Sequence, residues 1–248
     1  MSTAISNEGA LKWSYSRIAL YVLLVGIVFL SAQVVGTIVA GVMAVIVDRT
    51  LNVREWAEHA STNGVALAAA TLSSTLMCVP LVWRLAGSSD AARFLRLRAT
   101  SAKSIALWCS IVVAFVAASD LTSLAFGRPV VADFMVQAYS SAPPILIVLA
   151  IVVAAPLFEE IFFRGFLMSA LEARGLSAAA GAVVSAALWA VIHLQYDFYN
   201  VVVIFLTGLL LAAARIKTGS VIPCFFMHTL GNGIATVETA LVAEGVVG

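Results

Sequence analysis

The segment that decides the fold class runs from Pro144 to Ala170, PILIVLAIVVAAPLFEEIFFRGFLMSA, and almost all of it is apolar. At about 1.5 Å of rise per residue, a helix of this length crosses the ~30 Å hydrocarbon core of a bilayer. Three ionisable side chains interrupt it, Glu159, Glu160 and Arg164. Burying them is costly, and ionisable residues at membrane depth usually mark a functional site.

The whole chain shares this apolar character. Of its 248 residues, 62% are hydrophobic and 11% are charged, and the mean hydropathy is +1.05. Soluble domains are about half apolar and about a quarter charged, so the composition is that of a polytopic membrane protein. The net charge of +1 gives no sign of a basic surface that would bind nucleic acid. The expected partner is therefore the lipid bilayer. The three cysteines lie singly and predict neither a disulfide framework nor a zinc knuckle.

Seven apolar runs are long enough to cross as helices, which predicts an all-α, polytopic membrane bundle of seven or eight transmembrane helices. The runs lie near residues 18–47, 63–86, 103–126, 144–170, 177–198, 199–215 and 219–243. Only a short polar patch, Gln195 to Asn200, separates the fifth run from the sixth. It fits a turn between two spans, and it also fits a single broken helix. The four-residue spacing of small residues in the fifth run predicts close helix packing at Ala178, Ala182, Ala186 and Ala190.

Basic residues orient the predicted bundle with the N-terminus in the cytoplasm and the C-terminus outside. Of the 14 lysines and arginines, ten fall in the inner segments, from Lys12 to Lys217, and Arg164 lies within a span. The remaining three, Arg49, Arg54 and Arg128, fall in the outer segments. The inner loop at residues 87–103 is basic, and it fits either a short amphipathic helix on the membrane or a solvated loop.

Spacing sorts the polar residues inside the spans. Glu160 and Arg164 are four residues apart, so they can form an ion pair that either pins helices together or serves catalysis directly. Glu159 is rotated by about 100° from that face. It lacks this partner within its own helix and suits a general base. His228 and Asn232, in HTLGN, share a face in the same way.

His193 lies in WAVIHLQYD, between Trp189 and Asp197. We interpret Trp189 as a packing neighbour, and Asp197 either as an acceptor that orients His193 or as a solvated residue. At ~1.5 Å per residue, Glu159 and Asn232 lie about 22 Å above the inner ends of their spans, His193 about 27 Å and His228 about 16 Å. Three helices thus place polar groups in one slab of the membrane, as a site requires. His59, in an outer loop, is expected to be a surface residue.

These motifs resemble those of the CAAX prenyl endopeptidases and bacteriocin-processing proteins, the CPBP or Abi family of intramembrane proteases. EEIFFR at 159–164 is similar to the family motif E-E-x-x-x-R. WAVIH at 189–193 is similar to F-x-x-x-H, with Trp189 in place of phenylalanine. HTLGN at 228–232 is similar to H-x-x-x-N. The resemblance covers roughly the C-terminal 110 residues.

The resemblance implies peptide-bond hydrolysis in the membrane, on a lipidated or membrane-spanning peptide or protein substrate. Glu159 would be the base that activates water, and Glu160 would assist or be held by Arg164. His193 would polarise or position the reacting groups, and His228 with Asn232 would bind water and stabilise the oxyanion. A bacterial inner (plasma) membrane is the expected location. The predicted organisation is a cytoplasmic tail at 1–17, helices and loops at 18–142 and a catalytic core at 143–248.

Two questions stay open at this point. The two glutamates and two histidines could bind zinc, but H-E-x-x-H is missing from the sequence, and we expect glutamate catalysis with no required metal. The alternative function is a non-proteolytic scaffold, immunity factor or transporter that uses the buried polar cluster for binding. The sequence identifies neither the substrate nor the oligomeric state.

Overall fold

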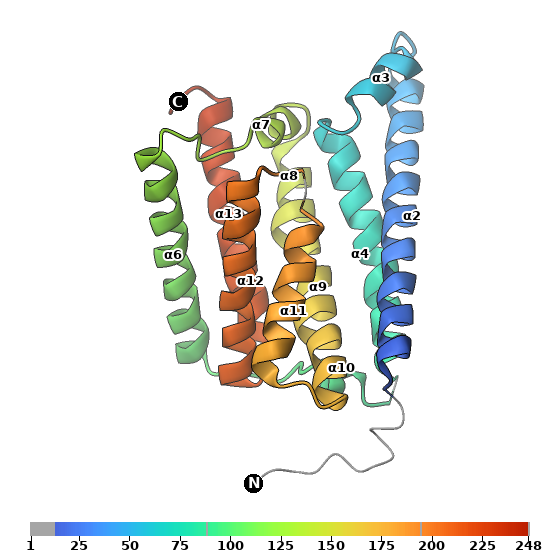
Figure 1. Cartoon of the computed structure of the whole chain (residues 1–248). Coiled ribbons are helices and arrows are strands. Elements are labelled where there is room, and N and C mark those ends of the chain that lie inside the picture. Colours follow the sequence, from blue (N-terminus) through green and yellow to red (C-terminus); the bar gives the residue numbers. More distant parts are fainter. Residues whose placement is uncertain (1–12, 88, 194, 248) are drawn as a thin grey trace. The chain divides into compact units, whose positions relative to one another are not determined.

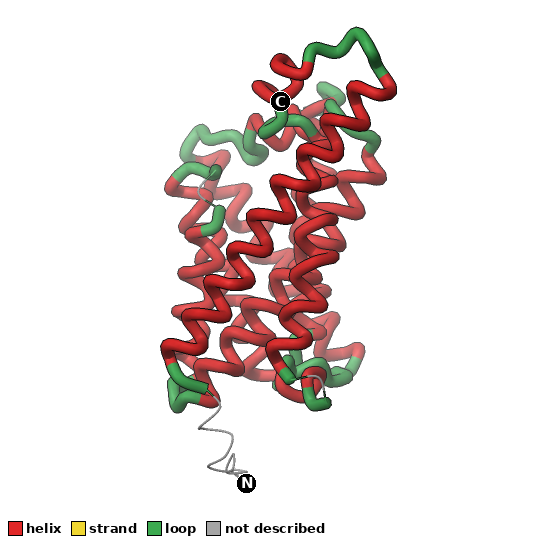
Figure 2. The backbone as a smooth tube through the Cα atoms, turned by 90° about the vertical axis from the view of Figure 1, so that its right-hand side faces the viewer, coloured by secondary structure: helices red, strands yellow, loops and turns green. Residues whose placement is uncertain are grey.

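Helices form every regular element in the part of the chain that the structure, a computed structural model, describes (Figure 2). The described residues are 13–87, 89–193 and 195–247. The predicted all-α fold class is therefore confirmed for these ranges. Lys12 and most of the predicted tail at 1–17 lie outside them.

Among the described residues, five helical segments are long and apolar enough to cross a membrane. They are α2 (Tyr15–Val47), α4 (Gly64–Ala86), α6 (Ala102–Ala125), the continuous run Pro144–Ala173 and α12 (Phe198–Thr218). They correspond to five of the seven predicted runs, as expected of an integral membrane protein. Three short helices join them: α3 (Val53–His59), α5 (Ala91–Phe94) and α7 (Asp133–Ser140).

The predicted count of seven or eight spans is not confirmed. The fifth run forms α11 (Ala178–Val191), whose 14 residues give about 21 Å of helix, too short to cross a bilayer alone. The seventh run forms α13 (Ile222–Ala243), which has 22 residues but carries polar side chains that dilute its apolar character. The patch after α11 is a turn: α12 begins at Phe198, and Asp197 caps it by accepting the N–H of Asn200 at 3.0 Å.

The run Pro144–Ala173 is not a plain α-helix. It alternates between α and π geometry in the order α8 (Pro144–Ile147), η1 (Val148–Ala154), α9 (Ala155–Glu159), η2 (Glu160–Leu167) and α10 (Met168–Ala173). A π-helix bonds each N–H to the carbonyl five residues earlier, and such turns are rare and frequent at functional sites. The EEIFFR motif lies at the junction of α9 and η2.

The chain divides into two compact units. The first comprises the residues up to Ile27, Val79–Cys109 and Glu159–Met227, and the second comprises Val28–Cys78, Ser110–Phe158 and the residues from His228 onward. Helices α11 and α12 lie wholly in the first unit and pack against each other (Figure 1). An aromatic cluster of Trp13, Phe94 and Phe166 also belongs to it, with the Trp13 and Phe94 rings stacked at 4.9 Å.

The inner loop at 87–103 is neither of the two alternatives predicted for it. Its helix α5 has only four residues, and Leu95 is completely buried. Arg98 donates from Nη2 to the carbonyl of Gly219 at 2.9 Å, and Ser220 Oγ donates to the carbonyl of Arg98 at 2.5 Å. The loop is therefore anchored on the turn between α12 and α13, within the first unit.

Candidate active site

Glu159 is the last residue of α9 and is only partly buried. Its Oε2 accepts a hydrogen bond from Nε1 of Trp189 on α11 at 2.5 Å. Trp189 is 3% exposed. Trp189 is buried as expected of a packing neighbour, and its indole N–H also contacts the predicted base directly.

Glu160 and Arg164 form the predicted ion pair, which is confirmed. Arg164 Nη1 lies 2.8 Å from Glu160 Oε1, and both residues are 0% exposed. Arg164 also donates from Nη2 to the carbonyl of Gly208 on α12 at 3.3 Å, and its guanidinium lies over the Trp189 ring at 4.5 Å. The pair is thus matched in charge within η2 and joined to both neighbouring helices, which lowers the cost of burying it.

His193 lies in the turn after α11 and not within a span, since the helix ends at Val191. Its Nδ1 lies 2.7 Å from the carbonyl oxygen of Trp189. A carbonyl can only accept, so Nδ1 carries the hydrogen, and in the neutral ring Nε2 is then the acceptor. This contact caps a carbonyl near the end of α11. Asp197, which was predicted either to orient this ring or to be solvated, is exposed and caps α12.

Tyr196 is a residue near Glu159 that sequence reasoning missed. It lies in the turn between α11 and α12, and burial together with the negative charge of Glu159 raises the pKa of its phenol to about 12. The phenol therefore keeps its proton over the whole physiological range. Its ring lies 6.3 Å from that of His193. No pattern in the sequence marks it, because its position relative to Glu159 depends on how two separate elements pack.

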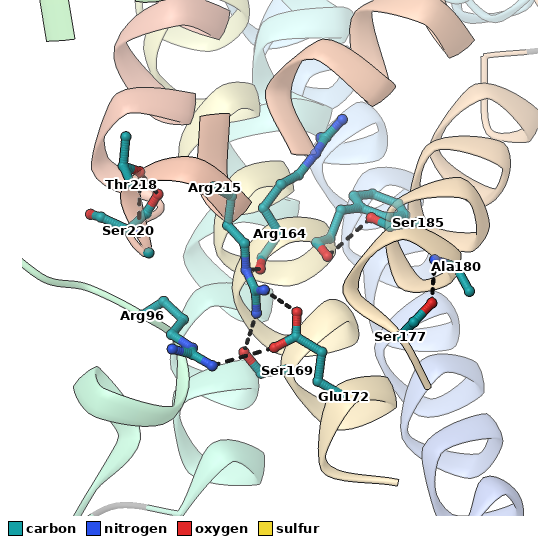
Figure 3. A network of polar contacts seen from close by, with 12 residues as sticks. Arg96, Arg164, Ser169, Glu172, Ser177, Ala180, Ser185, Arg215, Thr218 and Ser220 are labelled. Atoms are coloured by element: carbon teal, nitrogen blue, oxygen red, sulfur yellow. Dashed lines mark hydrogen bonds and ion pairs between the residues drawn. The ribbon is translucent and has the colours of Figure 1, made fainter. Parts of the chain in front are cut away.

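A second polar network continues from Arg164 toward the anchored inner loop (Figure 3). Arg215, 3% exposed in the last turn of α12, donates from Nε to the carbonyl of Arg164 at 3.2 Å and from Nη2 to Ser169 Oγ at 2.9 Å. It also forms an ion pair with Glu172, which Arg96 of the inner loop contacts at 3.3 Å. The network thus ties η2, α10, α12 and the loop together.

The small residues of α11 pack closely, as predicted from their spacing. Ala182, Ala186 and Ala190 are buried, and Ser185 Oγ donates to the carbonyl of Phe163 at 3.1 Å. A Cβ added at Gly208 would lie only 2.9 Å from the Cβ of Ala186. Small side chains on both helices therefore allow the close approach that places Trp189 beside η2.

His228 and Asn232 lie in α13 and belong to the second unit. His228 is 5% exposed. Asn232 donates from Nδ2 to the carbonyl of Ile151 in η1 at 2.8 Å, so part of its amide serves to hold that helix. Their convergence with Glu159 and His193 stays a prediction. His59 is exposed in α3, as predicted.

Two more ionisable side chains lie inside predicted spans and were not among the predicted site residues. Asp120 in α6 and Glu238 in α13, both in the second unit, hydrogen bond to each other.

The residues that could hold a metal are the predicted glutamates and histidines. Within the described ranges, however, no three His, Cys, Asp or Glu side chains are grouped to hold an ion, and Glu160 is matched by Arg164. The expectation that catalysis requires no metal stays a prediction.

In the described ranges, these features define a helical membrane protein with a buried polar network on η2, α10, α11 and α12. Residues 141–234 match the family model of the type II CAAX prenyl endopeptidase Rce1-like proteins. The resemblance stated from the three motifs is thereby confirmed for this segment, which contains all six predicted site residues. An uncharacterized 24.3 kDa protein of Escherichia coli is 33% identical over 86 residues, which are 34% of this chain and 40% of that protein. No solved structure matches the chain.

Proposed function

We propose that the protein is an intramembrane endopeptidase in which Glu159 activates water. The observation that carries the proposal is that the two adjacent carboxylates, Glu159 and Glu160, lie in different surroundings. Glu160 is buried and paired with Arg164. Glu159 is only partly buried, and its Oε2 accepts a hydrogen bond from Trp189 Nε1 on the neighbouring helix α11. The match of residues 141–234 to an endopeptidase family supports the same chemistry.

The proposed reaction is hydrolysis of one peptide bond. Glu159 takes a proton from water as the water oxygen bonds to the scissile carbonyl carbon, and the carbonyl oxygen becomes an oxyanion. The C–N bond then breaks, and the same proton passes from Glu159 to the leaving nitrogen. His193 offers Nε2 to the water, because its Nδ1–H is engaged by the Trp189 carbonyl. His228 and Asn232 are the proposed donors to the oxyanion.

The proposed substrate is a peptide that is lipidated or membrane-spanning near its cut site, because a site among membrane helices meets such chains and not soluble ones. The proposed location is a bacterial inner membrane. A metal is not needed for any of these steps.

Substitution of Glu159 by glutamine tests the proposal directly. Glutamine keeps the size and the oxygen that faces Trp189 but cannot take a proton, so cleavage of a membrane peptide by the purified protein should fall by about 10²-fold or more. Turnover is measured in detergent or vesicles, with thermal melting to show that the variant is folded. The matched control is Glu238→Gln in α13, which changes another glutamate, outside the proposed machinery, and should retain turnover.

Normal cleavage by Glu159→Gln would refute glutamate catalysis. The scaffold, immunity or transport hypothesis makes a different prediction in cells: deletion of the protein removes its phenotype, while Glu159→Gln leaves the phenotype intact. A cellular phenotype that tracks peptidase activity excludes that alternative.

A further inference from the structure

The geometry points to Trp189 as a positioning residue of the active site, which orients Glu159 through its indole N–H and His193 through its main-chain carbonyl. The inference rests on the proposed function, in which Glu159 is the base. Trp189 contacts both residues: its Nε1 lies 2.5 Å from Glu159 Oε2, and its carbonyl oxygen lies 2.7 Å from His193 Nδ1. All three residues lie in the first unit.

A positioning residue must itself be immobile, and Trp189 is held on several sides. It is 3% exposed. The guanidinium of Arg164 lies 4.5 Å from the centre of its ring, and that guanidinium is fixed in turn by Glu160. Gly208 of α12 lies so close that an added Cβ would be 3.1 Å from Trp189 Cε3. The indole thus has little room to rotate, and its N–H direction is set by the packing of three helices.

The two contacts have distinct chemical consequences. A carboxylate has two oxygens, and fixing one of them on a rigid donor also fixes the direction of the other. Glu159 is then presented in one orientation. The carbonyl contact assigns the hydrogen of neutral His193 to Nδ1, so that Nε2 is the acceptor. One residue therefore sets the geometry of two groups, one at the end of α9 and the other in the turn after α11.

A purely structural role for Trp189 predicts that a ring of similar shape suffices. Trp189→Phe keeps an aromatic ring for Arg164 and keeps the main-chain carbonyl, but it removes the N–H that contacts Glu159. The matched control is Trp13→Phe, which makes the same change at another buried tryptophan, 4% exposed, in the aromatic cluster with Phe94 and Phe166.

Two measurements on the full-length protein test the inference. In steady-state kinetics, Trp189→Phe should lower kcat by about 10- to 100-fold with KM changed by about twofold or less, as expected when an interaction used in the transition state is lost. Trp13→Phe should leave both constants close to those of the wild type. A Trp189→Phe enzyme with wild-type kcat overturns the inference even if Glu159→Gln is inactive.

The second measurement does not depend on activity. The indole N–H resonance of Trp189 is identified in 15N-tryptophan-labelled protein as the signal that disappears in Trp189→Phe. In Glu159→Ala this signal should shift strongly, because its acceptor is gone, while the Trp13 signal stays in place. An unchanged Trp189 signal overturns the inference. If the wild type cleaves no peptide, the proposed function fails, and this measurement still decides whether Trp189 holds Glu159.

Discussion

At residue 208, the absence of a side chain decides whether Trp189 fits beside η2. A Cβ there would lie 2.9 Å from Ala186 Cβ and 3.1 Å from Trp189 Cε3. Both neighbours belong to α11, a helix that cannot retreat without breaking the contact of Ser185 with the carbonyl of Phe163. Gly208 also offers its carbonyl to Arg164. Gly208 therefore both allows the close approach of α11 and α12 and supplies an acceptor for the buried Arg164 side chain.

Gly208→Ala should destabilise the protein, because overpacking between two closely packed helices costs about 1–3 kcal/mol. For a chain of this size we expect thermal melting in detergent to fall by about 2–10 °C. The control is Gly181→Ala in α11, where an added Cβ meets no atom within 4 Å. That change should leave the melting temperature unchanged or raise it, since alanine favours a helix over glycine by about 1 kcal/mol. Equal melting of the two variants would contradict the close approach.

The residues of the site differ in how far the sequence could predict them. The Glu160–Arg164 pair was predictable because both partners lie in one helix, where spacing determines the face. The contacts of Trp189 with Glu159, of Arg164 with Gly208 and of Arg215 with Glu172 join residues 30, 44 and 43 positions apart. Such contacts depend on which helices become neighbours, and spacing within one helix carries no information about that.

At the scale of elements, hydropathy predicted the long helices well and their ends poorly. The apolar run at 177–198 continues beyond the helix, yet α11 ends at Val191, where the His193 side chain takes the carbonyl of Trp189. The π segments η1 and η2 were also not predicted, because they keep the apolar composition of the α-helix around them. Both features lie beside predicted site residues: η2 begins directly after Glu159, and α11 ends two residues before His193.

The anchored inner loop gives a prediction at this scale. Ser220 donates to the carbonyl of Arg98 at 2.5 Å and accepts the N–H of Ile222 at 3.1 Å. Ser220→Ala should cost about 1–2 kcal/mol in the free energy of unfolding. It should also speed tryptic cleavage after Arg96 and Arg98, since the loop loses one of its anchors.

The matched control for Ser220→Ala is Ser177→Ala. Ser177 caps α11 by accepting the N–H of Ala180 at 3.2 Å, but it is no part of the loop anchorage. Its loss should lower stability modestly and leave the rate of loop cleavage unchanged. Accelerated cleavage in both variants would show that general loosening, and not the Ser220 contact, controls access to the loop.

At the scale of the whole molecule, the number of crossings determines on which side the C-terminus lies. Five crossings, or seven, put the two ends on opposite sides, whereas six put them on the same side. The short α11 and the polar α13 are the two helices that decide this number, because neither is among the five candidate spans. The basic residues favour a cytoplasmic N-terminus and an external C-terminus.

Terminal fusions test this prediction. In bacteria, a fluorescent protein that matures only in the cytoplasm should be bright at the N-terminus and dark at the C-terminus. A phosphatase that folds only outside should be active at the C-terminus. A fusion in the inner loop near Arg93 serves as the cytoplasmic control. A bright C-terminal fluorescent fusion would mean an even number of crossings, with either α11 or α13 failing to cross.

The Glu160–Arg164 pair has a consequence for biosynthesis. Its two charges lie four residues apart on one helix, so they neutralise each other as soon as that segment is helical, before any later helix has been made. The Arg215–Glu172 pair joins two helices and cannot form until α12 has been synthesised. The ribosome therefore delivers first a helix in which Glu160 and Arg164 already neutralise each other, and only afterwards Arg215, which pairs with Glu172. The Glu160–Arg164 pair can therefore enter the membrane with its two charges already compensated, in the order in which the chain is made.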